Sequence, residues 1–170
     1  MKVTKEMLHE DLRPYYGPLN AVTAVGRFKP IIKLMNLLTK LRQQGKDIDS
    51  LDCAEHFVPS GDGEWKIRTR VYRPKNVSGK LPVMLYIHGG GYIAGNPEQS
   101  GLIIEKFIQT RPCVVVSPDY RKAYTQPFPA GFNDCYETLL WARANADQLG
   151  IDAEKVIVAG HSAGGGLTAA

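Results

Sequence analysis

Apolar and polar residues follow two periods along the chain, one typical of helices and one typical of strands. Between residues 27 and 46 apolar side chains recur at helical spacing, with Pro30 near the start and Gly45 at the end, which predicts one amphipathic helix. Further along the chain the period shortens to two. Residues 65–72 then predict a half-buried edge strand, which forms an antiparallel hairpin with residues 56–58.

Three short apolar runs, at residues 83–87, 113–116 and 156–159, predict strands that are buried on both faces. Helical patterns at residues 98–109 and 129–150 separate these runs. Strands that alternate with helices form parallel sheets through right-handed crossovers, so we expect an α/β fold with a parallel sheet.

The composition is that of a folded domain, and the distribution of charge argues against a nucleic-acid partner. The 170 residues are 44% apolar and 22% charged, which excludes a disordered or fibrous chain. The net charge of +4 comes entirely from residues 1–50, which hold nine basic and five acidic side chains, because residues 51–170 hold twelve of each. The basic excess therefore lines no working face and no zinc-finger or RNA-recognition motif occurs, so we expect no nucleic-acid partner.

The predicted helix at residues 27–46 leaves two interpretations open. It contains six basic residues and no acidic one, which suits contact with a membrane surface or an acidic partner. It equally suits a helix that packs its apolar stripe on the domain beneath it. That stripe consists of Ile31, Leu34, Met35, Leu38 and Leu41.

The cysteines favour a reducing compartment. Cys53, Cys113 and Cys135 form no C-x-x-C pair, and their odd number leaves one unpaired in any disulfide scheme, so we expect reduced, partly buried thiols. The chain opens with no uninterrupted apolar run, and no apolar stretch reaches 18 residues. These features predict a soluble, cytoplasmic protein, either a monomer or a homo-oligomer.

The segments that follow the three predicted buried strands carry the candidate chemistry. They are His88–Tyr92, Ser117–Arg121 and Gly160–Gly164. The carboxyl ends of parallel strands line the ligand crevice of an open sheet, so we expect these segments to converge there.

The last of these segments has the Gly-x-Ser-x-Gly pattern of a nucleophile elbow, between a predicted strand and a predicted helix. The turn is so sharp that Gly160 and Gly164 cannot carry side chains, and it pushes Ser162 into the crevice. The amide of Ala163 then lies at a helix N-terminus, where negative charge is stabilised. We therefore expect Ser162 to act as a nucleophile.

The first segment supplies further hydrogen-bond donors. Bare backbone at Gly90 and Gly91 can direct two more amides at the oxygen of a bound carbonyl. Together with the amide of Ala163, they predict an oxyanion hole.

A dinucleotide site is the competing interpretation of the same glycines. Gly89, Gly91 and Ala94 fit the permissive Rossmann fingerprint, and Asp119 ends the next strand. However, Pro97 delays the following helix, and the fingerprint needs a helix N-terminus at the glycines to bind phosphate.

Five segments of the chain resemble the hormone-sensitive-lipase-like branch of the α/β-hydrolases, a family of serine carboxylesterases and lipases. The resemblance spans about residues 57–170. It rests on residues 88–92, 119–121, 127–135, 149–152 and 160–165. It implies an α/β-hydrolase fold with a mostly parallel sheet, helices on both faces and an N-terminal helical cap.

The resemblance also divides the chain and implies a function. Residues 1–50 would form the cap segment, and residues 51–170 the N-terminal part of a catalytic domain. The implied activity is hydrolysis of short- to medium-chain acyl esters through an acyl-enzyme, with a small-molecule ester as partner and no metal or organic cofactor. The implied site residues are Ser162 as nucleophile and the amides of Gly90, Gly91 and Ala163 as oxyanion hole.

Two departures from the family pattern lie close to this site. His161 occupies the position before the serine, where an acidic residue is usual, and residues 122–126 replace a Leu-Ala-Pro-Glu-like run. They affect the expected substrate shape and the electrostatics of the elbow, and they leave the nucleophile assignment intact.

A serine nucleophile needs a base and a carboxylate that orients this base, and the chain offers no clear candidate for either. In α/β-hydrolases these groups follow the serine, and only eight residues follow Ser162. His161 is not expected to be the base, because adjacent side chains on a tight turn diverge; His9, His56 and His88 have structural explanations. The acidic residues between 47 and 55 match no metal-binding spacing.

We therefore expect that the 170 residues are the N-terminal portion of a longer hydrolase and are inactive toward esters alone. The triad acid and base, with the remaining strands and helices, would follow residue 170. The alternative is a non-catalytic member of the same fold that binds a small molecule, as the gibberellin receptors of this family do.

Overall fold

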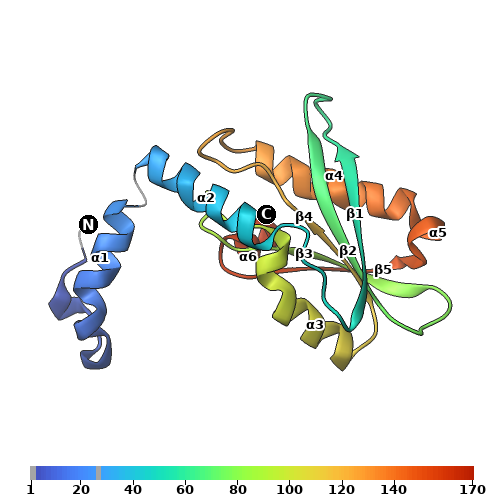
Figure 1. The fold of residues 1–170 in the computed structure, drawn as a ribbon, viewed down its shortest axis with the longest axis horizontal. Helices are drawn as coiled ribbons and strands as arrows, with labels where there is room; N and C mark the ends of the chain where they lie inside the picture. Colours follow the sequence, from blue (N-terminus) through green and yellow to red (C-terminus); the bar gives the residue numbers. More distant parts are fainter. Residues whose placement is uncertain (1–2, 26–27) are drawn as a thin grey trace.

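The computed structural model describes residues 3–25 and 28–170 and contains one five-stranded sheet with helices on both sides (Figure 1). The helical elements are η1 (Lys5–Met7), η2 (Glu10–Tyr15), α1 (Tyr16–Val25), α2 (Lys29–Gln43), η3 (Pro97–Ser100), α3 (Gly101–Thr110), α4 (Ala130–Ala144), α5 (Ala146–Leu149) and α6 (Ala163–Ala169). The strands are β1 (Leu51–Pro59), β2 (Lys66–Pro74), β3 (Leu81–Ile87), β4 (Val114–Pro118) and β5 (Ile151–Gly160).

The sheet is mixed, with the strand order β1-β2-β4-β3-β5. β1 and β2 form the predicted antiparallel hairpin, and β2 is also antiparallel to β4. Only β4, β3 and β5 run parallel, with β3 in the centre. The expected α/β-hydrolase architecture is present, and its parallel part is confined to these three strands.

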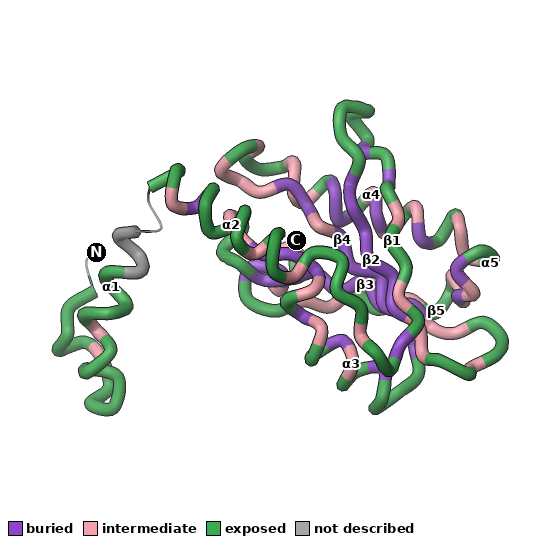
Figure 2. Tube along the Cα trace, viewed as in Figure 1, coloured by how far each residue is buried: buried purple, intermediate pink, exposed green. Residues whose placement is uncertain are grey.

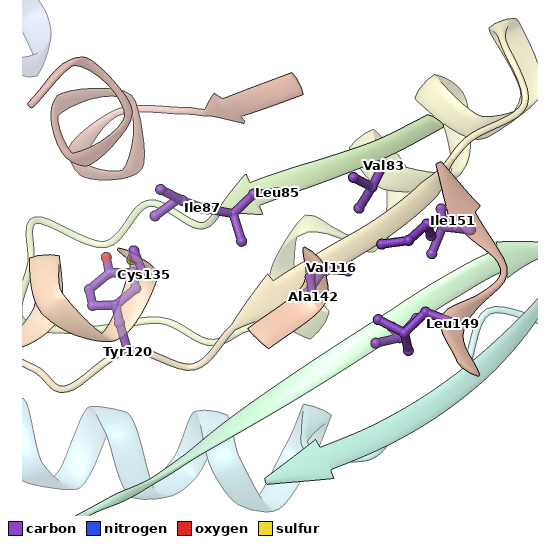
Figure 3. Packing of buried hydrophobic residues seen from close by; sticks show 11 residues of the cluster. Val83, Leu85, Ile87, Val116, Tyr120, Cys135, Ala142, Leu149 and Ile151 are labelled. Atoms are coloured by element: carbon purple, nitrogen blue, oxygen red, sulfur yellow. The ribbon is translucent and has the colours of Figure 1, made fainter. Parts of the chain in front are cut away.

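Alternate residues of the central strands pack into separate cores on the two faces of the sheet. On one face Leu85 and Val116 pack with Cys135 and Ala142 of α4 (Figure 3). On the other face Met84, Tyr86 and Val115 pack with Ile104 and Ile108 of α3. Full burial of each such side chain contributes about 1.5–3 kcal/mol, so these two layers hold the sheet and the loops at its edge in place.

The prediction that β2 is a half-buried edge strand is wrong. β2 lies between β1 and β4, and all its residues from Ile67 to Tyr72 are buried (Figure 2). Arg68 and Arg70 are buried because acidic side chains from other segments neutralise them. Arg68 pairs with Glu55 at 2.6 Å and with Glu98, and Arg70 pairs with Asp47.

The prediction that residues 156–159 are buried on both faces is also wrong. β5 pairs only with β3 and forms an edge of the sheet. Ile157 is 50% exposed and Val158 is 37% exposed, because in the described part of the chain nothing covers this strand on its open side.

The amphipathic helix predicted at residues 27–46 is present as α2, although Arg27 lies outside the described residues. Its apolar stripe does not pack on the domain, since Leu34, Met35, Leu38 and Leu41 are exposed and Ile32 is its buried residue. α1 stands apart from the sheet (Figure 1). Among the described helices, none has the length and apolar character needed to cross a membrane. The assignment of residues 1–50 as a cap stays a prediction.

Candidate active site

β5 and α6 meet in a turn that places Ser162 in an unusual backbone conformation. Ser162 directly precedes the first residue of α6 and has φ 54° and ψ −123°. Positive φ is rare for a residue with a side chain and is tolerated where the surrounding structure enforces it. A strand, a strained serine and a helix in this order form the geometry of a nucleophile elbow.

The glycines on both sides of Ser162 allow this turn. A Cβ atom at Gly160 would lie 2.6 Å from the carbonyl carbon of Gly164. A Cβ atom at Gly164 would lie 2.0 Å from the carbonyl oxygen of Ile87, which ends β3. The structure therefore excludes side chains at both positions, as the sequence predicts.

The glycine loop, residues 88–96, follows β3 and begins beside the elbow, because the register of the sheet pairs Ile87 with Gly160. The amides of Ile93 and Ala94 donate to the carbonyl oxygen of Gly90, at 3.1 and 2.9 Å. Gly90 has φ 126°, and a Cβ atom there would lie 1.9 Å from the carbonyl oxygen of Ala94. The loop is thus a tight turn with a defined shape.

Three amides around the elbow are available to a ligand. The N–H groups of Gly90, Gly91 and Ala163 donate to no acceptor within residues 3–25 and 28–170. In contrast, the amide of Gly164 donates to the carbonyl oxygen of His161 at 2.9 Å. Unpaired amides near a helix N-terminus are the groups that bind an oxyanion.

His88 stabilises the glycine loop through a hydrogen bond to its backbone. Its ring is buried, its Nδ1 donates to the carbonyl oxygen of Gly89 at 2.6 Å, and its Nε2 accepts from Lys122 Nζ at 3.0 Å. Lys122 also donates to Asp119 Oδ1 at 2.9 Å and to the carbonyl oxygen of Tyr120 at 2.7 Å. Burial, followed by the Lys122 ammonium, holds the pKa of His88 well below its ordinary value, so this ring stays neutral.

His161 contacts the glycine loop from the elbow side. The amide of Gly89 donates to its Nε2 at 3.3 Å, and its Nδ1 lies 3.0 Å from the hydroxyl of Tyr86. The ring therefore does not serve Ser162, whose hydroxyl makes no hydrogen bond within the described residues. The sequence did not predict the contact with Gly89; the departure from an acidic residue at this position was its only signal.

The three segments expected to converge do so. The hydroxyl of Tyr120 donates to the carbonyl oxygen of His88 at 3.0 Å, and the amide of Ala123 donates to the carbonyl oxygen of Tyr92 at 2.8 Å. Below this edge Arg121 forms a buried ion pair with Asp134 at 2.7 Å, which fixes the segment after β4.

No base for Ser162 is present in the described part of the chain. His88 and His161 hold the glycine loop, the ring of His56 lies 5.1 Å from the ring of Trp141, and His9 lies in the exposed N-terminal segment. Across the same residues, no three His, Cys, Asp or Glu side chains are grouped so that they could hold a metal ion.

Two cavities border these elements. The smaller, of about 280 Å³, is mostly apolar and lies beside α6, where Tyr92, Phe128, Phe132 and Leu167 are among its lining residues. The larger, of about 650 Å³, lies between α2 and the β1–β2 hairpin, and none of the predicted site residues lines it. None of them lines the smaller cavity either, which borders Gly166 and Leu167 of α6, the helix that follows the elbow.

The geometry does not favour a dinucleotide site. The glycine loop leads into η3, a short 3-10 helix that begins at Pro97, and α3 begins only at Gly101. The helix that follows the glycine loop therefore does not begin at the glycines, where a Rossmann site would bind the pyrophosphate.

A family described by the alpha/beta hydrolase fold matches residues 84–170, which include the glycine loop, the elbow and the strands that carry them. The chain belongs to the α/β-hydrolase family. This membership confirms the fold class that the sequence motifs predict.

Comparison with single proteins shows similarity to esterases. Carboxylesterase NlhH of Mycobacterium tuberculosis is 41% identical over 108 residues, which are 64% of this chain and 34% of the relative. An arylesterase of Saccharolobus solfataricus is 38% identical over 108 residues, 63% of this chain and 35% of the relative. A solved bacterial heroin esterase superposes with a TM-score of 0.72 at 34% identity and covers 82% of this chain and 44% of its own.

These three proteins are considerably longer than the 170-residue chain. The matches cover about a third of the length of the two sequence relatives and less than half of the solved structure.

Proposed function

We propose that the protein hydrolyses carboxylic esters with Ser162 as nucleophile. Ser162 Oγ bonds to the acyl carbon while its proton passes to a base, and the alcohol leaves with that proton. Water then breaks the bond between Oγ and the acyl group. The observation that carries this proposal is the strained backbone of Ser162 between two glycines that cannot be replaced.

The amides of Gly90, Gly91 and Ala163 form the oxyanion hole in this proposal. Their lack of acceptors within the described residues supports the role, because a developing oxyanion would satisfy all three. The loss of one such donor typically lowers kcat by about 10²- to 10³-fold.

The general base and its orienting carboxylate are proposed to come from sequence that follows Ala170. The support is the absence of a free histidine near Ser162 in the described residues, together with the greater length of the relatives. The 170 residues alone would then bind an ester without hydrolysing it at an enzymatic rate.

The proposed substrates are short- to medium-chain acyl esters. The cavity of about 280 Å³ beside α6 supports this size, and its aromatic and aliphatic lining would suit an acyl chain. The names of the relatives, a carboxylesterase and an arylesterase, support the class of reaction.

The proposal extends to location and association. A cytoplasmic location accords with the three free cysteines, of which Cys113 and Cys135 are buried. The exposed apolar face of α2, beside its lysines, supports contact with a membrane surface or with a second copy of the chain.

Hydrolysis of a chromogenic butyrate ester by the full natural polypeptide tests the proposal. We expect the Ser162→Ala variant to lose at least about 10³-fold in kcat, because only uncatalysed and binding contributions remain. Ser78→Ala is a matched control, since Ser78 is exposed and lies in the turn between β2 and β3. Equal rates for Ser162→Ala and the unaltered protein would overturn the assignment. Loss of activity in both variants would show a nonspecific effect and would also count against it.

A further inference from the structure

We propose that His161 is a positioning residue that holds the glycine loop in its working shape through one tautomer of its neutral ring. The juxtaposition that carries the proposal joins segments 72 residues apart, the amide of Gly89 and Nε2 of His161, at 3.3 Å. The consequence for catalysis rests on the proposed function, while the hydrogen bond and its tautomer do not.

The hydrogen bonds of the ring define its protonation. An amide N–H can only donate, so Nε2 must carry a lone pair to accept from Gly89. The proton of the neutral ring is then on Nδ1, which donates to the hydroxyl oxygen of Tyr86 at 3.0 Å. Burial raises the pKa of Tyr86, which keeps this hydroxyl protonated and uncharged.

The contact between Gly89 and His161 is also one of close packing. A Cβ atom at Gly89 would lie 2.8 Å from Nε2 and 3.0 Å from the carbonyl oxygen of His161. The ring and the backbone of the elbow thus lie against the bare Gly89 backbone. A side chain at position 89 would collide with His161, which explains why a glycine precedes Gly90 and Gly91. The amides of Gly90 and Gly91 are the ones left without an acceptor in the described residues.

His161 and His88 bind the two backbone polar groups of Gly89. The carbonyl oxygen of Gly89 accepts from Nδ1 of His88, and the amide of Gly89 donates to His161. Lys122 fixes His88, and Tyr86 fixes His161. With Gly89 held at both its N–H and its C=O, the directions of the following amides are set relative to Ser162.

Protonation of His161 would break this arrangement. A charged imidazolium carries a hydrogen on Nε2, which would face the N–H of Gly89, and two donors cannot share a bond. The titratable groups near the ring in the described residues are the Tyr86 hydroxyl from β3 and the His88 ring from the glycine loop, with the Lys122 ammonium behind His88. The bond therefore requires the neutral ring with its lone pair on Nε2.

Long-range ¹H–¹⁵N correlation spectra of the 170-residue chain test the proposal without any activity. At pH 7.5 we expect a protonated Nδ1 and an unprotonated Nε2 on His161, and an amide signal of Gly89 shifted downfield by its hydrogen bond. In His161→Ala the acceptor is removed, so the Gly89 amide signal should move upfield. In His161→Gln the side-chain oxygen replaces Nε2 as acceptor, so the Gly89 amide should keep its shift. In the matched control His56→Gln the Gly89 amide should be unchanged, because His56 contacts Trp141.

A protonated Nε2 at pH 7.5, or a Gly89 amide whose shift is unchanged in His161→Ala, would overturn the proposal. In the ester-hydrolysing polypeptide we further expect His161→Ala to lower kcat about 10- to 100-fold with a smaller change in KM, since misplacement of the amides affects the transition state. His161→Gln should restore most of this loss, because its side-chain oxygen can accept from the amide of Gly89. If no ester is hydrolysed while the spectra behave as expected, the proposed function fails and the positioning role stands.

Discussion

The glycines that follow Ser162 differ in whether the structure leaves space for a side chain. Gly164 faces the carbonyl oxygen of Ile87 so closely that an added methyl group would lie 2.0 Å from it. Gly165, the next residue of the same helix, has its nearest such contact at 3.4 Å, from the carbonyl oxygen of Gly160. Two adjacent glycines therefore differ sharply in what they tolerate, and the difference depends on how α6 packs on β3.

Gly164→Ala should lower the free energy of unfolding by about 3 kcal/mol or more, because backbone atoms must move to accept the methyl group. Gly165→Ala, the matched control, should change it by less than about 1 kcal/mol, since alanine favours the helix and the contact is nearly ordinary. Urea unfolding followed by circular dichroism measures both. Equal effects of the two substitutions would contradict the described packing of the elbow.

At the scale of elements, β2 shows how distant residues decide what a strand buries. The alternation of Ile67 and Thr69 with Arg68 and Arg70 predicts one apolar and one solvated face. Both faces are buried, because Glu98 of η3 and acidic residues near β1 come together over the arginines. This pairing joins segments about 30 residues apart and cannot be inferred from local periodicity.

Glu98→Gln should destabilise the fold at pH 7 by about 3 kcal/mol, because the buried arginines then lack their anionic partner. Burial acts to raise the pKa of Glu98, but the hydrogen bonds from Arg68 and from the amide of Gly45 outweigh it and lower the pKa overall. A lowered pKa gives stability that is present above the pKa of the unfolded chain and is lost as the pH falls below it.

Thermal unfolding between pH 6 and pH 3 measures this dependence. The unaltered chain should lose more stability over this range than Glu98→Gln, in which position 98 no longer titrates. Parallel curves for the two proteins would contradict the buried ion pair. Glu64→Gln is a suitable control, since Glu64 is exposed in the β1–β2 turn.

The order and type of the central elements could be predicted from the sequence, because their apolar periods and their Pro and Gly boundaries are local. The elbow was predictable for the same reason, since the two glycines and Ser162 lie within five residues. The hydrogen bond between Gly89 and His161 was not, because it depends on the register that pairs Ile87 with Gly160. The exposure of β5 depends on which strand lies beside it, which its own sequence does not specify.

At the scale of the whole molecule, α2 connects the N-terminal segment to the glycine loop. The side-chain amide of Asn36 donates to the carbonyl oxygen of Ile93 at 2.9 Å, and the amide of Gly45 donates to Glu98 Oε1 at 2.8 Å. The apolar stripe of α2 adds little to this attachment, because most of it is exposed. Polar contacts at two points therefore place α2 near the candidate active site.

Asn36→Ala should loosen α2, because the removed hydrogen bond to the loop contributes about 1 kcal/mol, and amide exchange within residues 29–43 should rise about five- to tenfold. Hydrogen–deuterium exchange with mass spectrometry measures this rate. Lys33→Ala is the control, since Lys33 is exposed on the same helix. An unchanged exchange rate in Asn36→Ala would contradict the attachment.

The central claim is that Ser162 forms an acyl-enzyme, and trapping that species tests it most directly. The full natural polypeptide would be mixed with a chromogenic butyrate ester, quenched in acid during the burst and digested for peptide mass mapping. We predict a butyryl group on the peptide that contains Ser162, and none on that peptide in Ser162→Ala. A butyryl group on a different residue, or ester hydrolysis that persists in Ser162→Ala, would contradict the account.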